Sequence, residues 1–162
     1  MFGPAEVLDP RSSVFWLRVG AAILCGGIIG LERQLRGKAA GIRTSILVCL
    51  GTYLFVEMGA SLGGERADPT RVLGQVVTGI GFLGGGVILA RKGMLLGVTS
   101  AAVIWVLAAI GSTIGLGRIA AAMVLSLVTV LVLVGVEFLE ATFKRLSGGL
   151  YREERESHEL EK

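Results

Sequence analysis

Apolar residues gather in five long runs, and polar residues gather between them. The runs cover approximately residues 14–31, 44–62, 72–90, 98–116 and 119–139. A helix rises about 1.5 Å per residue and the hydrocarbon core of a bilayer is about 30 Å thick, so about 20 apolar residues span it. No run alternates in the way that barrel strands do, and backbone groups in lipid must pair within their own segment. The pattern predicts an all-α membrane protein, a bundle of about five transmembrane helices.

Basic residues concentrate in alternate connections, which predicts the orientation. By the positive-inside rule, the N-terminus lies outside and the C-terminus in the cytoplasm. We expect a transmembrane domain over residues 1–140 and a short charged cytoplasmic tail over 141–162, as a frayed helix or disorder. The short link at residues 115–118 leaves a four-span alternative, which would place the C-terminus outside. The basic residues assigned to the cytoplasmic side are Arg33, Arg36, Lys38, Arg43, Arg91, Lys92, Lys144 and Arg145.

Composition excludes an ordinary soluble domain. Apolar residues make up 52% of the chain and charged residues 18%, and the mean hydropathy is +0.72. The net charge of +3 is assigned to cytoplasmic loops, so no nucleic-acid partner is expected. Cys25 and Cys49 fall inside apolar runs and are interpreted as packing residues. The first run lacks a basic leader before it and is expected to stay as an anchor.

Glycines recur at helical spacing inside the apolar runs. Residues 79–84 match the G-x-G-x-x-G string of dinucleotide-binding proteins, but they lie in an apolar span with no strand before them. We interpret the glycines as close helix–helix contacts, within the chain or in a homodimer or higher oligomer. The alternative is a flexible or broken helix that lines a pathway. The predicted packing positions are Gly26, Gly30, Gly79, Gly81, Gly84, Gly85, Gly111 and Gly115.

Two charged residues fall at membrane depth, Arg18 in the first run and Glu57 in the second. Each lies about five residues from the outer end of its run, so we predict a structural ion pair, with Arg71 and Gln75 nearby. The alternative is a cation site at Glu57. A lone carboxylate beside arginines is a poor cage for Mg²⁺, which prefers six oxygen ligands.

The connection between the first two runs is also charged. Glu32, Arg33 and Arg43 either anchor the helix ends at lipid phosphates or hold an anionic ligand or the carboxylates of a partner. Glu32 joins Glu57 as a weak metal candidate, and no cofactor is expected.

The remaining polar and aromatic positions do not form a catalytic pattern. Trp105 lies in the middle of a run and is interpreted as a packing residue, and Thr99 and Ser100 are expected to cap or bridge helices. His158 stands alone in the tail. Because no nucleophile lies beside a base, the chain is not expected to be an enzyme.

Together these motifs resemble the MgtC/SapB family of bacterial inner-membrane proteins, over about residues 17–117. The matching strings are Leu17–Arg18, Gly30–Gln34, Ala40–Thr44, Leu47–Gly51, Asp68–Arg71, Gln75–Gly86 and Gly97–Ala102 leading into Trp105.

The resemblance implies a multi-pass protein of the bacterial inner (plasma) membrane, whose relatives are linked to growth in low magnesium and to virulence. The best-known relative restrains the proton-translocating ATP synthase. No catalytic role follows for the residues at motif positions, which are Arg18, Glu32, Arg33, Arg43, Thr44, Arg71, Gln75, Thr99 and Trp105.

Three features depart from the family pattern. Many relatives carry a cytoplasmic C-terminal domain, whereas this chain is expected to have only the membrane domain. Val106 stands where the best-known virulence member has cysteine, and Glu57 stands where relatives have an apolar or small residue. We therefore expect a non-catalytic regulator that acts by helix–helix contact in the lipid bilayer, with ATP synthase as a candidate partner. A transporter or channel for Mg²⁺ or another small ion is the alternative.

Overall fold

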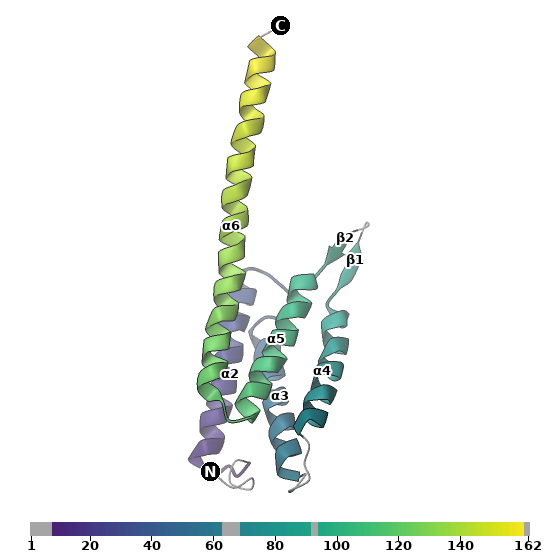
Figure 1. Cartoon of the computed structure of the whole chain (residues 1–162), viewed down its shortest axis with the longest axis vertical. Coiled ribbons are helices and arrows are strands. Elements are labelled where there is room, and N and C mark those ends of the chain that lie inside the picture. Colours follow the sequence, from purple (N-terminus) through teal and green to yellow (C-terminus); the bar gives the residue numbers. More distant parts are fainter. Residues whose placement is uncertain (1–7, 63–68, 92–93, 161–162) are drawn as a thin grey trace. The chain divides into compact units, whose positions relative to one another are not determined.

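The computed structural model describes residues 8–62, 69–91 and 94–160, and in this part of the chain it contains five helices and two short strands (Figure 1). They form two compact units, residues 1–127 and 128–162, which are described separately. The elements in chain order are α2 (Ser13–Leu35), α3 (Ile42–Leu62), α4 (Pro69–Gly86), β1 (Leu89–Arg91), β2 (Met94–Leu96), α5 (Val98–Gly115) and α6 (Ile119–Leu160).

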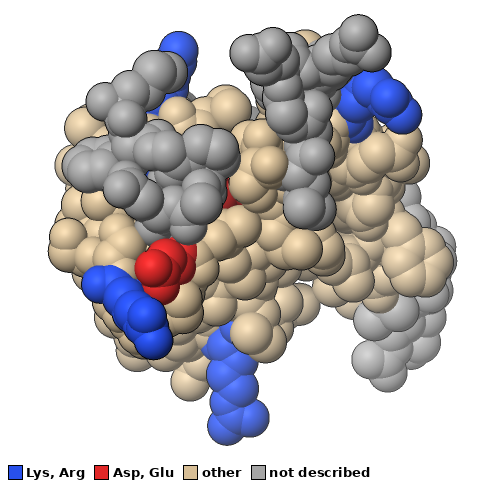
Figure 2. All heavy atoms as spheres, turned by 90° about the horizontal axis from the view of Figure 1, so that it is seen from below, with Lys and Arg blue, Asp and Glu red and all other residues tan. Residues whose placement is uncertain are grey.

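Four of these helices are long and apolar enough to cross a bilayer. They are Ser13–Leu35, Ile42–Ser61, Val98–Gly115 and Ile119–Leu139. They confirm four of the predicted runs, so the chain is a multi-pass membrane protein. Seen from below, few charged side chains are visible, and the Lys and Arg side chains lie mostly at the margin (Figure 2). The orientation of the termini stays a prediction.

The predicted span at residues 72–90 needs correction. Its helix, α4, starts earlier, at Pro69, and ends earlier, at Gly86. With six glycines as well as Arg71 and Gln75, α4 does not reach the hydropathy of the four spans. Glycine is a weak helix former, and the run Gly84–Gly86 accounts for the early end.

The strands β1 and β2 were not predicted. They pair antiparallel, with Leu89 opposite Leu96 and Arg91 opposite Met94. Gly97 follows β2 with a φ of +89°, and a Cβ atom there would lie 2.1 Å from the carbonyl oxygen of Val87. Only glycine fits this entry into α5.

Helix α3 lies at the centre of the first unit. It packs against α2 on one side and against α5 on another, and α4 contacts both α3 and α5. The buried core includes Cys25, Ile29, Cys49, Tyr53 and Leu107. Both cysteines are free, in agreement with their interpretation as packing residues.

The first turns of α6 belong to the same unit. Ser126 donates a hydrogen bond from its hydroxyl to the carbonyl oxygen of Cys25 at 3.2 Å, and the sulfur atoms of Cys25 and Met123 lie 3.4 Å apart. Within the second unit the helix continues past the predicted end of the span, as far as Leu160.

The connection between α2 and α3 contains a strained residue. Ala40 has a φ of +61°, whereas left-handed conformations are favourable chiefly for glycine. We expect Ala40→Gly to raise the free energy of unfolding by about 1 kcal/mol, because the strain outweighs the added chain entropy. Thermal unfolding in detergent, followed by circular dichroism, measures the change. The neighbouring variant Ala39→Gly is the control and should be neutral or destabilising; a lower stability for Ala40→Gly contradicts the interpretation.

Candidate functional site

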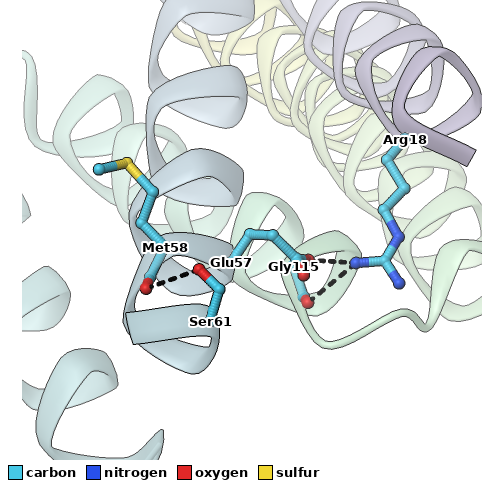
Figure 3. A network of polar contacts seen from close by, with 5 residues as sticks. All are labelled: Arg18, Glu57, Met58, Ser61 and Gly115. Carbon is cyan, nitrogen blue, oxygen red and sulfur yellow. Dashed lines mark hydrogen bonds and ion pairs between the residues drawn. The ribbon is translucent and has the colours of Figure 1, made fainter. Parts of the chain in front are cut away.

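The predicted pair of Arg18 and Glu57 is present. Arg18, on α2, donates from Nη1 to Oε2 of Glu57, on α3, and the side chains are only 14% and 7% exposed (Figure 3). The same Nη1 atom lies 3.4 Å from the carbonyl oxygen of Gly115, the last residue of α5. One guanidinium group therefore joins three helices at their predicted outer ends.

The sequence also predicted that Arg71 and Gln75 lie near the pair, and it left a cation site at Glu57 as the alternative. The bonds of the pair involve Arg18, Glu57 and Gly115, and neither Arg71 nor Gln75 takes part in them. Within the described ranges, no group of three or more His, Cys, Asp or Glu side chains is placed to hold a metal ion. Glu57 is already the acceptor of an arginine, so its carboxylate neutralises a buried cation.

A second polar cluster lies at the opposite end of α2. Arg33 is 3% exposed and donates from Nη2 to the hydroxyl of Ser100 on α5 at 2.7 Å. This bond bridges α2 and α5, in agreement with the expectation that Thr99 and Ser100 cap or bridge helices. Glu32 is also buried, and its Oε1 lies 2.7 Å from Nε of Arg36.

Two atoms of this cluster have no hydrogen-bond partner, Oε2 of Glu32 and Nε of Arg33. Burial without a partner is costly for both atoms. Sequence reasoning placed Glu32 and Arg33 at the membrane surface, and the structure places both side chains inside the bundle. The two side chains therefore lie between packed helices and do not form an anion site that is open to the surface.

The remaining family-motif positions are exposed. Arg43 and Thr44 lie in the first turn of α3, and Arg71 and Gln75 lie near the start of α4. Thr99, in the first turn of α5, is exposed as well. Trp105 is 53% exposed in the single chain, and its interpretation as a packing residue stays a prediction.

The predicted glycine contacts divide into two groups. In the first, added Cβ atoms would strike backbone or Cβ atoms of α3: Gly26 meets the carbonyl oxygen of Ser45 at 2.7 Å, Gly30 meets Cα of Ile42 at 2.6 Å, Gly111 meets the carbonyl oxygen of Cys49 at 2.3 Å, and Gly115 meets Cβ of Val56 at 2.8 Å. These four glycines let α2 and α5 approach α3 closely.

The second group lies on α4. Gly84 makes ordinary contact with Ala101, at 3.6 Å from its carbonyl oxygen, whereas Gly79, Gly81 and Gly85 have nothing within 4 Å of a built Cβ. Gly74 is equally open. Helical periodicity places four small, exposed residues on one side of α4, which we call the glycine face: Gly74, Thr78, Gly81 and Gly85.

A groove of about 700 Å³ separates α3 from α4 on another side of α4. Its lining is mainly apolar and includes Leu47, Val48, Phe55, Val76 and Leu83. The side chains that bring polar atoms to it are Thr44, Thr52 and Gln75. The hydroxyl of Thr52 already donates to the carbonyl oxygen of Val48. The groove suits an apolar occupant and offers little to a hydrated ion.

Comparison with known proteins places these features in context. A family model for the MgtC family matches residues 19–142. "Putative magnesium transporter YhiD" of Escherichia coli K12 is 45% identical over 134 residues, which cover 78% of this chain and 61% of that protein. "Protein MgtC" of Brucella abortus is 43% identical over 106 residues, covering 65% of this chain and 44% of that protein.

"Protein MgtC" of Salmonella typhimurium is 45% identical over 103 residues, covering 63% of this chain and 43% of that protein. The chain thus spans between about four and six tenths of the length of these relatives. No solved structure matches.

Proposed function

The chain belongs to the MgtC family, and on that premise we propose that it is a non-catalytic regulatory protein of the bacterial inner membrane, linked to magnesium homeostasis. The relative named "Putative magnesium transporter YhiD" connects the family to magnesium by name. The proposed action is a helix–helix contact that restrains another membrane complex, with ATP synthase as the candidate partner. A role in virulence is part of the same proposal.

The observation that carries the proposal is the glycine face of α4. Without side chains larger than threonine, it lets a second helix approach closely, as small residues do in membranes. The corresponding small faces of α2 and α5 are already used against α3. The glycine face is open in the single chain, so it is available to a partner.

The transporter alternative receives less support. The charges at Arg18 and Glu57 are paired with each other, and the groove between α3 and α4 is mainly apolar. An ion pathway needs polar groups along its length to replace the hydration shell.

Gly81→Leu tests the proposal because it adds a side chain to the glycine face at a position where a built Cβ meets nothing within 4 Å. In inverted membrane vesicles that contain ATP synthase, the wild-type chain should lower ATP-driven proton pumping, read from a pH-sensitive dye. We expect Gly81→Leu to lose at least about nine tenths of this effect, since a blocked helix contact costs about 1.4 kcal/mol or more, which is tenfold in affinity.

The matched control is Gly20→Leu, on α2, where a built Cβ also meets nothing within 4 Å. It should inhibit like the wild type. Equal inhibition by Gly81→Leu, or magnesium flux into protein-only vesicles, contradicts the proposal. We also propose a homodimer or higher oligomer through the same face, so Gly81→Leu should lower the mass measured by sedimentation in detergent.

A further inference from the structure

The groove between α3 and α4 is long enough for a hydrocarbon chain. Its lining extends along α3 from Thr44 to Gly59, sixteen residues, or about 22 Å at 1.5 Å per residue. The groove has a volume of about 700 Å³ and is lined mainly by apolar side chains. Burying a hydrocarbon tail against such a lining is favourable, so an acyl chain is a suitable occupant.

Glycines on both walls keep the groove open. Gly51 on α3 and Gly79 on α4 line it, and a Cβ built on either residue meets nothing within 4 Å. A leucine at these positions would project into space that is now empty. The width of the groove therefore depends on two residues at which a Cβ atom can be added without a clash.

A basic side chain stands at one end of the groove. Arg43 is exposed and lies one helical turn before Leu47, which lines the groove, so both residues share one side of α3. Arg18 pairs with Glu57 and Arg36 pairs with Glu32, and Arg43 takes part in neither of these two ion pairs. Thr44 adds a hydroxyl group at the same end.

The predicted orientation puts Arg43 at the cytoplasmic surface. Basic residues beside transmembrane helices on this side bind anionic headgroups, because the charge attracts the phosphate while the apolar groove takes the tail. The first turn of α3 also carries the positive end of the helix dipole. The positive charge of Arg43 and the apolar groove thus lie at the same end of α3.

We propose that this groove is a binding site for an anionic phospholipid, with one acyl chain between α3 and α4 and the phosphate at Arg43 and Thr44. The ligand differs from any partner helix on the glycine face, because the groove lies on another side of α4. The site also fills the space between α4 and the central helix α3.

Native mass spectrometry of the full chain in detergent tests the site. The protein is mixed with equal amounts of phosphatidylglycerol and phosphatidylcholine, which have similar tails and differ in headgroup charge. The wild type should retain phosphatidylglycerol preferentially. We expect Arg43→Gln to lower that preference about fivefold, the factor for one basic side chain near an anionic surface.

The double variant Gly51→Leu/Gly79→Leu should lose most of the retained lipid of both kinds, because leucine side chains fill the groove. Gly74→Leu is the matched control, since it is equally open on α4 but lies outside the groove, and its lipid count should equal that of the wild type. Circular dichroism verifies that each variant is helical. If a variant fails to fold, Gly79→Leu alone replaces the double variant.

Two results overturn the proposal. The first is equal retention of both lipids by the wild type, which removes the role of Arg43. The second is an unchanged number of bound lipids when leucine fills the groove. This result also covers the case in which the leucine variant changes only the oligomeric mass, which would mean that a second copy of the chain, and not a lipid, occupies the groove.

Discussion

Gly111→Ala is expected to be the most damaging addition of a single methyl group at the contacts between the helices. Its Cβ atom would lie 2.3 Å from the carbonyl oxygen of Cys49 and 2.8 Å from the hydroxyl oxygen of Thr52. A backbone carbonyl inside a packed helix cannot rotate away, so α5 must separate from α3. We expect the free energy of unfolding to fall by about 3 kcal/mol or more. Thermal or denaturant unfolding in detergent, followed by circular dichroism, measures the loss.

The control variant is expected to change the free energy of unfolding in the opposite direction. Gly20→Ala, on the exposed side of α2, has nothing within 4 Å of the added Cβ. Because alanine is the better helix former, this variant should gain about 0.5–1 kcal/mol. Similar stability changes for both variants would show that α5 does not lie as close to α3 as the structure places it.

The second large effect is expected from Glu57→Leu. The substitution removes the carboxylate from Arg18 and leaves a guanidinium group that is 14% exposed at membrane depth. Breaking one side of a buried pair costs about 3–5 kcal/mol, because the remaining charge keeps its desolvation penalty. Unfolding in detergent should show a loss of this size.

The double variant Arg18→Met/Glu57→Leu separates the pair from the individual residues. Apolar side chains of similar volume often replace a buried ion pair without loss. The double variant should therefore recover most of the stability that Glu57→Leu loses. A double variant as unstable as the single one would mean that Arg18 contributes mainly through the carbonyl group of Gly115.

Much of the architecture could be predicted from the sequence. Four apolar runs coincide with membrane-spanning helices, and the depth of Arg18 and Glu57 in their runs was enough to predict their contact. Depth is a property of sequence position, since each helical residue adds a fixed rise. The spacing of Gly26 and Gly30 likewise indicated a helix contact.

Other features depend on how each helix is rotated. Helix α5 is apolar nearly all round, so no polar stripe marks the side that faces lipid, and the 53% exposure of Trp105 could not be predicted. For the same reason, the bridging role of Ser100 was expected but its partner, Arg33, was not predicted. The groove could not be predicted, because its width depends on the separation of two helices. The strands β1 and β2 are three residues each, too short for an apolar period to show.

The contact between Arg18 and Glu57 has a consequence for biosynthesis. The two residues are 39 positions apart, so Arg18 leaves the ribosome well before its counter-ion. An arginine at the middle of a lone inserting helix costs about 2.5–3.5 kcal/mol on translocon scales, and a position nearer the end costs less. Passage of α2 into lipid together with α3, as a hairpin, avoids exposing the unpaired cation. Nascent chains that end before residue 57 should therefore be retained at the translocon.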